Sequence, residues 1–241
     1  MQEIDRLFRH LKKSPGVKSI FNPWYDRDPK HDRNTLASRI RRCNLRCFLE
    51  QRVGRARYLL VGEALGYQGG HFTGIAMTSE RILLGGLQER GISPEVVFRG
   101  QHLRTSSPQL KPQGFTEPTA TVVWGSITAA GRDPFEFVLW NILPWHPFER
   151  RRGMLSNRTP RQTEIATGWP AMTLMREIFP QAQVIAVGRK AAANLAALGM
   201  AHACVRHPAQ AGAAQFRAQF RGIVGRSKAA PRYHRQQRAT R

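Results

Sequence analysis

The chain has 241 residues, of which 38 are Lys or Arg and 16 are Asp or Glu, leaving a net charge of +22. This length can bury one sizeable core, so we expect a single domain with appendages. Such a one-sided charge exceeds what solubility needs and attracts polyanions, of which nucleic acid is the commonest partner of a soluble protein.

Cysteine content and hydropathy exclude two other classes of protein. Three cysteines, an odd number, imply no disulfide framework and fit a reducing compartment. No apolar run approaches membrane-spanning length, and residues 1–6 lack the apolar core of a secretory signal. We therefore expect a cytoplasmic protein that does not bind membranes.

The first third of the chain is rich in basic residues. Residues 1–33 are charged and interrupted by prolines, and their aromatic side chains predict an extension that packs on the body of the domain. The next segment predicts a helix with one core-facing stripe, Leu36, Ile40, Cys43 and Cys47. Its arginines suit contacts to phosphate, and a merely solvated helix face is the alternative.

Residues 58–61 are apolar and predict a strand buried on both faces. The strand is expected to end at Gly62, and Glu63 follows it. Glycines recur through the next twelve residues, so the backbone there can turn sharply and approach a ligand closely. Ser79 is the expected cap of a helix that ends at Gly91. Ligands of open α/β sheets lie outside the carboxyl ends of the strands, where Glu63 falls.

The remainder of the chain alternates between helix and strand patterns. Residues 92–118 have four prolines and little periodicity, so we expect an irregular excursion. The remaining predicted strands are 135–141, 183–188 and 203–206, and the remaining predicted helices are 119–130, one capped by Thr159, 170–178, 189–198 and 211–220. The alternation predicts an α/β fold, with a parallel sheet between two helical layers. Residues 226–241 contain no acid and predict a disordered basic tail after a domain that spans 1–225.

Three polar side chains follow predicted strands, namely Glu63, Asn141 and His207. Because parallel strands finish at one edge of a sheet, these side chains can converge. The set suits hydrolysis of a base–sugar bond, which builds positive charge on the sugar and negative charge on the base. Glu63 could activate water and face the sugar cation, Asn141 could match the edge of one pyrimidine, and His207 could stabilise the departing base. Taken alone, each of these residues is as readily explained by a structural role as by a catalytic one.

Six short motifs occur in the order typical of one enzyme family. They are GEALG at 62–66, GIAM at 74–77, WNILPWHP at 140–147, NRTP at 157–160, AVG at 186–188 and HPA at 207–209. Together they resemble the uracil-DNA glycosylase superfamily, and the branch with a Gly-Glu-Ala-Pro-Gly first motif is the nearest. The resemblance covers roughly residues 35–223. It implies an α/β/α sandwich around a four-stranded parallel sheet and uracil excision from DNA without a metal or other cofactor.

By position, the resemblance makes Glu63 the residue that handles water, Asn141 the uracil reader and His207 the stabiliser of the departing base. Gly62, Ala64 and Met77 then lie where the family holds the base, and Gln210 lies at the loop that enters the DNA. Three further candidates come from the residues themselves: Tyr67, or Phe72 in its place, for a ring that stacks on the base, and Arg158 and Arg206 for phosphate contacts. A salt-bridged or solvated role is the alternative for both arginines, and His146 either lines the pocket or caps a turn.

The sequence also departs from this branch. Leu65 stands where the branch has proline, Met77 where it has phenylalanine, and Gly69 and Gly70 where it often has acidic residues. An iron–sulfur cluster needs four cysteines, so the three present are interpreted as core residues.

We therefore expect a monomeric, monofunctional DNA-repair glycosylase that removes uracil or a related deaminated base and acts on single- or double-stranded DNA. The departures motivate one alternative, a non-catalytic DNA-binding protein that keeps the fold. A third interpretation is an RNA-associated protein that binds mainly through its tail.

Overall fold

A computed structural model describes residues 2–225 of the chain. Its centre is a four-stranded sheet in the order β3-β2-β5-β6, in which every neighbouring pair is parallel. The strands are β2 (Tyr58–Ala64), β3 (Phe137–Leu143), β5 (Gln183–Val187) and β6 (Ala203–Val205). Each of the three longer strands contains an apolar run of four residues, because both faces of a parallel sheet are covered by helices.

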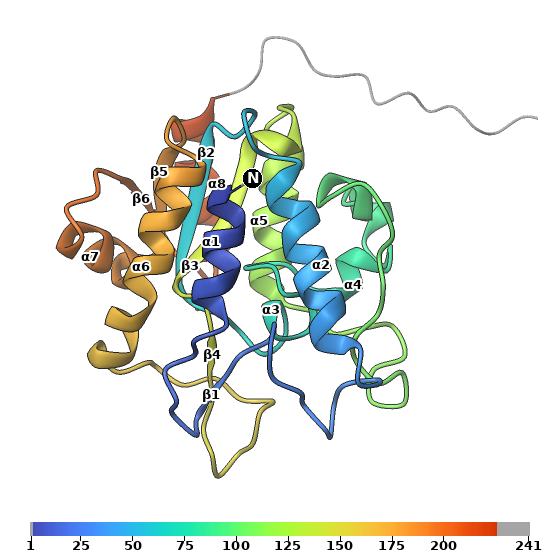
Figure 1. The fold of residues 1–241 in the computed structure, drawn as a ribbon. Coiled ribbons are helices and arrows are strands. Elements are labelled where there is room, and N and C mark those ends of the chain that lie inside the picture. Colours follow the sequence, from blue (N-terminus) through green and yellow to red (C-terminus); the bar gives the residue numbers. More distant parts are fainter. Residues whose placement is uncertain (1, 226–241) are drawn as a thin grey trace, which may run out of the picture.

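Helices cover the two faces of the sheet (Figure 1). The crossover helices α6 (Gln162–Ile178) and α7 (Arg189–Ala197) pack on one face. On the other, α5 (Pro118–Ala129) packs against α8 (Ala213–Val224). This division follows from right-handed crossovers between parallel strands. The chain steps across the sheet one way from β2 to β3 and the other way from β3 to β5 and β6, so the connecting helices lie on opposite faces. The predicted three-layer α/β/α sandwich with a four-stranded parallel sheet is confirmed.

The N-terminal 50 residues wrap around this sandwich. α1 (Gln2–Leu11) packs on α6 and buries Ile4, Leu7, Phe8 and Leu11. The short strand β1 (Ile20–Phe21) then pairs antiparallel with β4 (His146–Pro147), just beyond the end of β3. The N-terminal segment thus braces the loop that follows the Asn141 strand.

The segment between β2 and α5 has little regular structure, as predicted for residues 92–118. Its short helices are α3 (Gly70–Thr73), α4 (Glu80–Leu83), η1 (Gln88–Arg90) and η2 (Pro94–Val96). A further short helix, η3 (Pro134–Glu136), lies after α5, just before β3. Ser79 precedes α4, but its side chain does not cap the helix. The buried Glu80 carboxylate holds the excursion instead, accepting the backbone N–H groups of Thr105 and Ser106 at 2.8 and 2.9 Å.

The predicted core-facing stripe of the second helix is wrong. In α2 (Ala37–Glu50) the buried face includes Arg41 and Asn44, whereas Leu36 is 53% exposed. The Arg41 guanidinium pairs with Asp32 at 2.6 Å, and the Asn44 amide donates to a backbone carbonyl, so both polar side chains are satisfied inside. Cys43 consequently faces solvent.

The expectation of three core cysteines is wrong for Cys43 and Cys204, whereas Cys47 packs against the core. Cys43 and Cys204 are exposed, and Cys47 is half-buried. No group of three or more His, Cys, Asp or Glu within residues 2–225 is placed to hold a metal ion.

Two element boundaries differ from the prediction. The helices expected at Thr159 and at residues 170–178 are a single helix, α6, which begins after Arg161 and contains Pro170. Buried side chains on both sides of the proline, such as Ile165 and Met172, keep the helix in place. In addition, β2 runs on to Ala64, so Gly62 and Glu63 lie within the strand.

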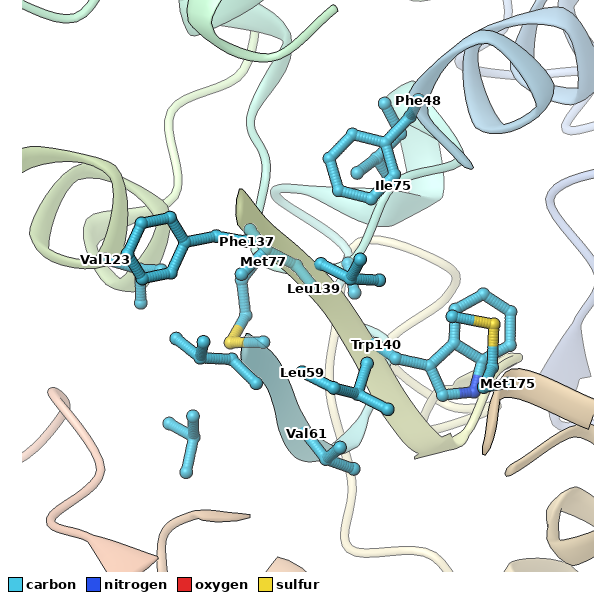
Figure 2. Packing of buried hydrophobic residues seen from close by; sticks show 14 of the residues in the cluster. Phe48, Leu59, Val61, Ile75, Met77, Val123, Phe137, Leu139, Trp140 and Met175 are labelled. Carbon is cyan, nitrogen blue, oxygen red and sulfur yellow. The ribbon is translucent and has the colours of Figure 1, made fainter. Parts of the chain in front are cut away.

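Apolar side chains from the sheet and from both helical layers form one core, to which Met77 belongs (Figure 2). Among the described residues, no helix combines the length and hydropathy needed to cross a membrane. The basic tail expected at 226–241 lies outside the described residues.

Candidate active site

A cavity of about 850 Å³ opens at the carboxyl edge of the sheet. Nine residues that the sequence singled out line it, namely Gly62, Glu63, Ala64, Met77, Asn141, Arg158, Arg206, His207 and Gln210. They come from the ends of β2, β3 and β6 and from the loops that follow. Tyr67 does not line it, although its backbone N–H donates to Asn157 Oδ1, which does.

Glu63, near the end of β2, presents a carboxylate at the cavity wall. Its side chain is 28% exposed, and Oε1 lies 3.5 Å from Lys190 Nζ. The same ammonium donates to Thr159 Oγ1 at 3.1 Å, so Thr159 and Lys190 together orient the carboxylate. An exposed ion pair of this kind is worth at most about 1 kcal/mol, so its contribution is to orientation and not to stability.

Asn141 lies beside Gly62 in the parallel register of β2 and β3, and is 3% exposed. A Cβ atom at position 62 would lie 2.5 Å from Asn141 Oδ1, and 3.9 Å from Met77 Sδ. Only glycine at position 62 leaves space for the amide in this orientation. The glycine of the first motif therefore positions the side chain that the third motif supplies.

His207 follows β6 and has a defined tautomer. Its Nδ1 accepts the backbone N–H of Ala209 at 3.1 Å, so the neutral ring carries its proton on Nε2. Burial, and next the nearby Arg206 charge, lower the pKa of His207. Gly188 lets β5 approach, since a Cβ there would lie 3.1 Å from His207 Cβ. The arrangement gives a neutral N–H donor in the cavity wall.

Backbone strain marks the same cavity independently of any motif. Met77, Gln210 and Ala211 are the non-glycine residues within 2–225 that have positive φ, at 47°, 52° and 59°. All three line the cavity. Such conformations cost of order 1–3 kcal/mol each and cluster at functional sites.

Two arginines predicted to contact phosphate have different surroundings. The Arg158 guanidinium is paired with both carboxylate oxygens of Glu164, at 2.7 and 2.8 Å, and also donates to Ser19. Only 17% of the Arg158 side chain is exposed, which favours the salt-bridged alternative. Arg206 and Gln210 are exposed at the cavity rim, so their side chains can reach a ligand.

Two side chains considered for the pocket are structural. Phe72 is fully buried and stacks on Phe115, with 4.1 Å between ring centroids, so it does not supply a ring to the cavity. His146 is buried in a chain of hydrogen bonds, with its Nδ1 3.0 Å from His71 Nδ1 and its Nε2 2.8 Å from a backbone carbonyl. Burial lowers the pKa of His146 to about 3. This network, which continues from His71 to Asp28, fixes the loop after β3.

Three of the cavity-wall residues that sequence reasoning missed have polar or charged side chains that bear on the site, namely Asn157, Lys190 and Glu117. Asn157 and Lys190 carry a weak signal, because one opens the NRTP motif and the other follows Gly188 at the end of a strand. Glu117 carries no such signal, since a lone acid before a helix is commonplace. Its Oε2 is nevertheless buried without a hydrogen-bond partner, and burial raises the pKa of Glu117 to about 7.

A protein-family model described as the uracil DNA glycosylase superfamily matches residues 51–234. The chain belongs to the uracil DNA glycosylase superfamily. All of the cavity residues named above lie within the matched range, and members of this superfamily are DNA glycosylases, which are hydrolases.

A solved structure supports the same fold. The chain superimposes on the crystal structure of wild-type SMUG2 from Pedobacter heparinus with a TM-score of 0.56 and 14% sequence identity, covering 92% of this chain and 95% of that one. At this identity the likeness concerns the fold. Comparison with curated protein sequences found no match.

Proposed function

We propose that this protein is a monofunctional DNA glycosylase that hydrolyses the N-glycosidic bond of uracil, or of a related deaminated base, and leaves an abasic site. One observation carries the proposal: Glu63 of β2, Asn141 of β3 and His207, which follows β6, line a single cavity. Its volume of about 850 Å³ falls in the range of small-molecule pockets. A flipped nucleotide is a ligand of that class.

The proposed reaction divides charge between the sugar and the base. Glu63, half-exposed at the wall, orients a water molecule toward the anomeric carbon and faces the positive charge that develops on the sugar. The water oxygen bonds to that carbon as the C–N bond breaks, and the water proton passes to the carboxylate. The bonding electrons leave with the base.

His207 and Asn141 act on the base. The Nε2–H of His207 donates to a carbonyl oxygen of the base, which becomes more negative in the transition state. A neutral imidazole suits this role, because it donates without a proton having first to be taken up. The Asn141 amide offers both a donor and an acceptor, matching the N–H and carbonyl edge of uracil.

DNA is the proposed partner, and electrostatics supports the choice. The tail at 226–241 contains six Lys or Arg and no acid, so 16 of the 22 net charges belong to residues 1–225. The body of the protein is therefore itself basic, which favours binding to the phosphate backbone. We propose that the protein acts as a cytoplasmic monomer.

The first test is release of uracil from a labelled oligonucleotide, followed by alkali to cleave the abasic strand. Wild type should give alkali-dependent cleavage, Glu63→Gln should lose it, and Glu89→Gln, which changes an exposed acid, should retain it. Absence of cleavage above the Glu63→Gln level would overturn the proposal. A panel with hypoxanthine, xanthine and mismatches would define the preferred base.

Two further experiments test the role of Asn141 in reading the base and the absence of a strand-cutting activity. Asn141→Asp should relax selectivity toward cytosine, and an unchanged base preference would remove Asn141 from the reading role. Strand breaks before alkali treatment, or a borohydride-trapped adduct at Lys190, would contradict monofunctional action, because Lys190 is a lysine that lies beside Glu63.

A second candidate, a DNA-binding protein without activity, is favoured by the packing at the two substituted motif positions. Leu65 and Met77 are buried, at 3% and 5% exposure, and Leu65 fills the space next to Gly70. This candidate predicts binding that weakens steeply with salt, without base release from any lesion.

A further inference from the structure

Glu117 immediately precedes α5, but its side chain does not cap that helix. The carboxyl group turns instead toward the glycine-rich loop after β2. A Cβ atom at Gly69 would lie 1.9 Å from Glu117 Oε2, and one at Gly66 would lie 3.4 Å from Oε1. The two glycines leave the space that this carboxyl group occupies.

One oxygen of this carboxyl group has no partner there. Glu117 Oε2 is buried and accepts no hydrogen bond. Glu117 as a whole is half-buried, whereas the fully buried acids in the described part of the chain are all paired: Asp28 with His31 and His71, Asp32 with Arg41, Glu80 with Ser106, and Glu164 with Arg158. A buried carboxyl group left unpaired destabilises the fold, so its presence calls for a use outside the fold.

The surroundings of Glu117 favour its neutral form. Burial raises the pKa of Glu117 to about 7, and no neighbouring charge contributes to the shift. The charged or titratable groups that line the cavity from other elements are Glu63, Arg158, Arg189, Lys190, Arg206 and His207. A neutral carboxyl group both donates and accepts hydrogen bonds, whereas a carboxylate only accepts.

Glu117 lines the same cavity as Asn141 and His207, together with Pro118, Thr119 and Val122 of α5. We propose that Glu117 is a specificity-determining residue of this site, whose carboxyl group donates a hydrogen bond to a carbonyl oxygen of the flipped base. The inference rests on the proposed function, and it adds a contact from the helical layer to those from the strand ends. It also accounts for the buried Oε2 atom of Glu117, which has no hydrogen-bond partner within the described part of the chain.

The test measures binding and needs no turnover. Full-length wild type, Glu117→Gln, Glu117→Leu and the surface control Glu89→Gln are titrated with two oligonucleotides of one sequence. One oligonucleotide contains 2′-fluoro-2′-deoxyuridine, which resists hydrolysis, and the other a tetrahydrofuran abasic analogue. The ratio of the two affinities isolates the contribution of the base, and it is measured from pH 6 to pH 8.5.

In wild type and in Glu89→Gln, the ratio should fall about tenfold as the pH rises through 7, which is the loss expected for one hydrogen bond. Glu117→Gln keeps a donor and cannot ionise, so its ratio should stay near the wild-type value at pH 6 throughout the range. Glu117→Leu should show a ratio about tenfold lower at every pH. Contributions of His207 to the pH profile are present in all four proteins and cancel in the comparison.

Thermal melting separates this role from a structural one. Because Glu117→Leu removes an unpaired buried carboxyl group, it should melt at a higher temperature than wild type at pH 8 while binding the base less well. Equal ratios in wild type and Glu117→Leu, a wild-type ratio of one, or lower melting temperatures in both Glu117 variants would each overturn the inference. Wild type that releases no uracil but shows the pH-dependent ratio would overturn the proposed function alone.

Discussion

Gly62→Ala is the substitution whose effect can best be worked out from the structure. The added methyl group would lie 2.5 Å from Asn141 Oδ1 and 3.7 Å from Cγ, and side-chain methyl groups do not approach other atoms within 3.0 Å. Gly62 in β2 is paired with Asn141 in β3, so the backbone cannot move away without breaking the pairing of these two strands. The Asn141 amide must therefore rotate.

The magnitude follows from that rotation. Holding a side chain about 30° off its rotamer costs of order 0.5–1.5 kcal/mol. Two misplaced hydrogen bonds to the base forfeit about 1–3 kcal/mol more in the transition state. We expect kcat/KM for uracil release to fall roughly 5- to 150-fold, at ~1.4 kcal/mol for each factor of ten, because the rotamer strain is common to the free enzyme and the transition state. The free energy of unfolding should fall by no more than about 1.5 kcal/mol, because only the rotamer strain remains in the free protein.

The assay combines steady-state release of uracil from an oligonucleotide with urea unfolding of the same preparations. Gly222→Ala in α8 is the matched control, because a Cβ there has open space around it. It should leave kcat/KM unchanged and stabilise the helix by about 0.5–1 kcal/mol. A Gly62→Ala enzyme with kcat/KM within threefold of wild type would refute the reasoning. Loss of more than about 3 kcal/mol of stability would show that the clash is not confined to a rotamer.

Three other outcomes follow from the structure. The pKa of Glu117 is about 7 in the folded chain, against an ordinary value of 4.5, so unfolding releases its proton between these values and stability falls as pH rises through this window. Urea unfolding should show a decline of at most ~3 kcal/mol that Glu117→Gln lacks. Asp32→Ala leaves the Arg41 guanidinium buried without its counter-ion and should cost about 3–5 kcal/mol in the same measurement; a cost below ~1 kcal/mol would mean that water reaches Arg41. Deleting residues 226–241 should flatten the plot of log affinity against log salt by at most about five units while leaving uracil release intact, whereas loss of all DNA binding would favour the tail-driven interpretation.

The sheet and the convergence of the three site residues could be predicted because their causes are local. Apolar runs such as 58–61 form strands wherever both faces are covered, and the polar residue that ends each strand then reaches the same edge. The N-terminal helix was also predictable in principle. Ile4, Leu7, Phe8 and Leu11 have helical spacing, but the charged residues between them obscured it.

The missed features depend on contacts between distant parts of the chain. The buried face of α2 is set by Asp32, which neutralises Arg41, and periodicity alone places arginine outside. Pro170 ends a helix by local rules, yet tertiary packing carries α6 through it. Glu117 is exceptional only because Gly66 and Gly69 surround it, and no spacing in the sequence reveals that an acid lacks a partner.

The left-handed backbone at Met77, Gln210 and Ala211 has a consequence for laboratory evolution. Glycine adopts these angles without penalty, so the exposed positions Gln210 and Ala211 each offer stabilisation of the order of 1 kcal/mol that the natural chain forgoes, whereas Met77 is held by its packing in the core. A library selected only for resistance to heat should therefore collect glycines around the cavity before it changes the distant surface. Heat-resistant survivors that have lost uracil release would identify this rim as the place where durability and catalysis compete.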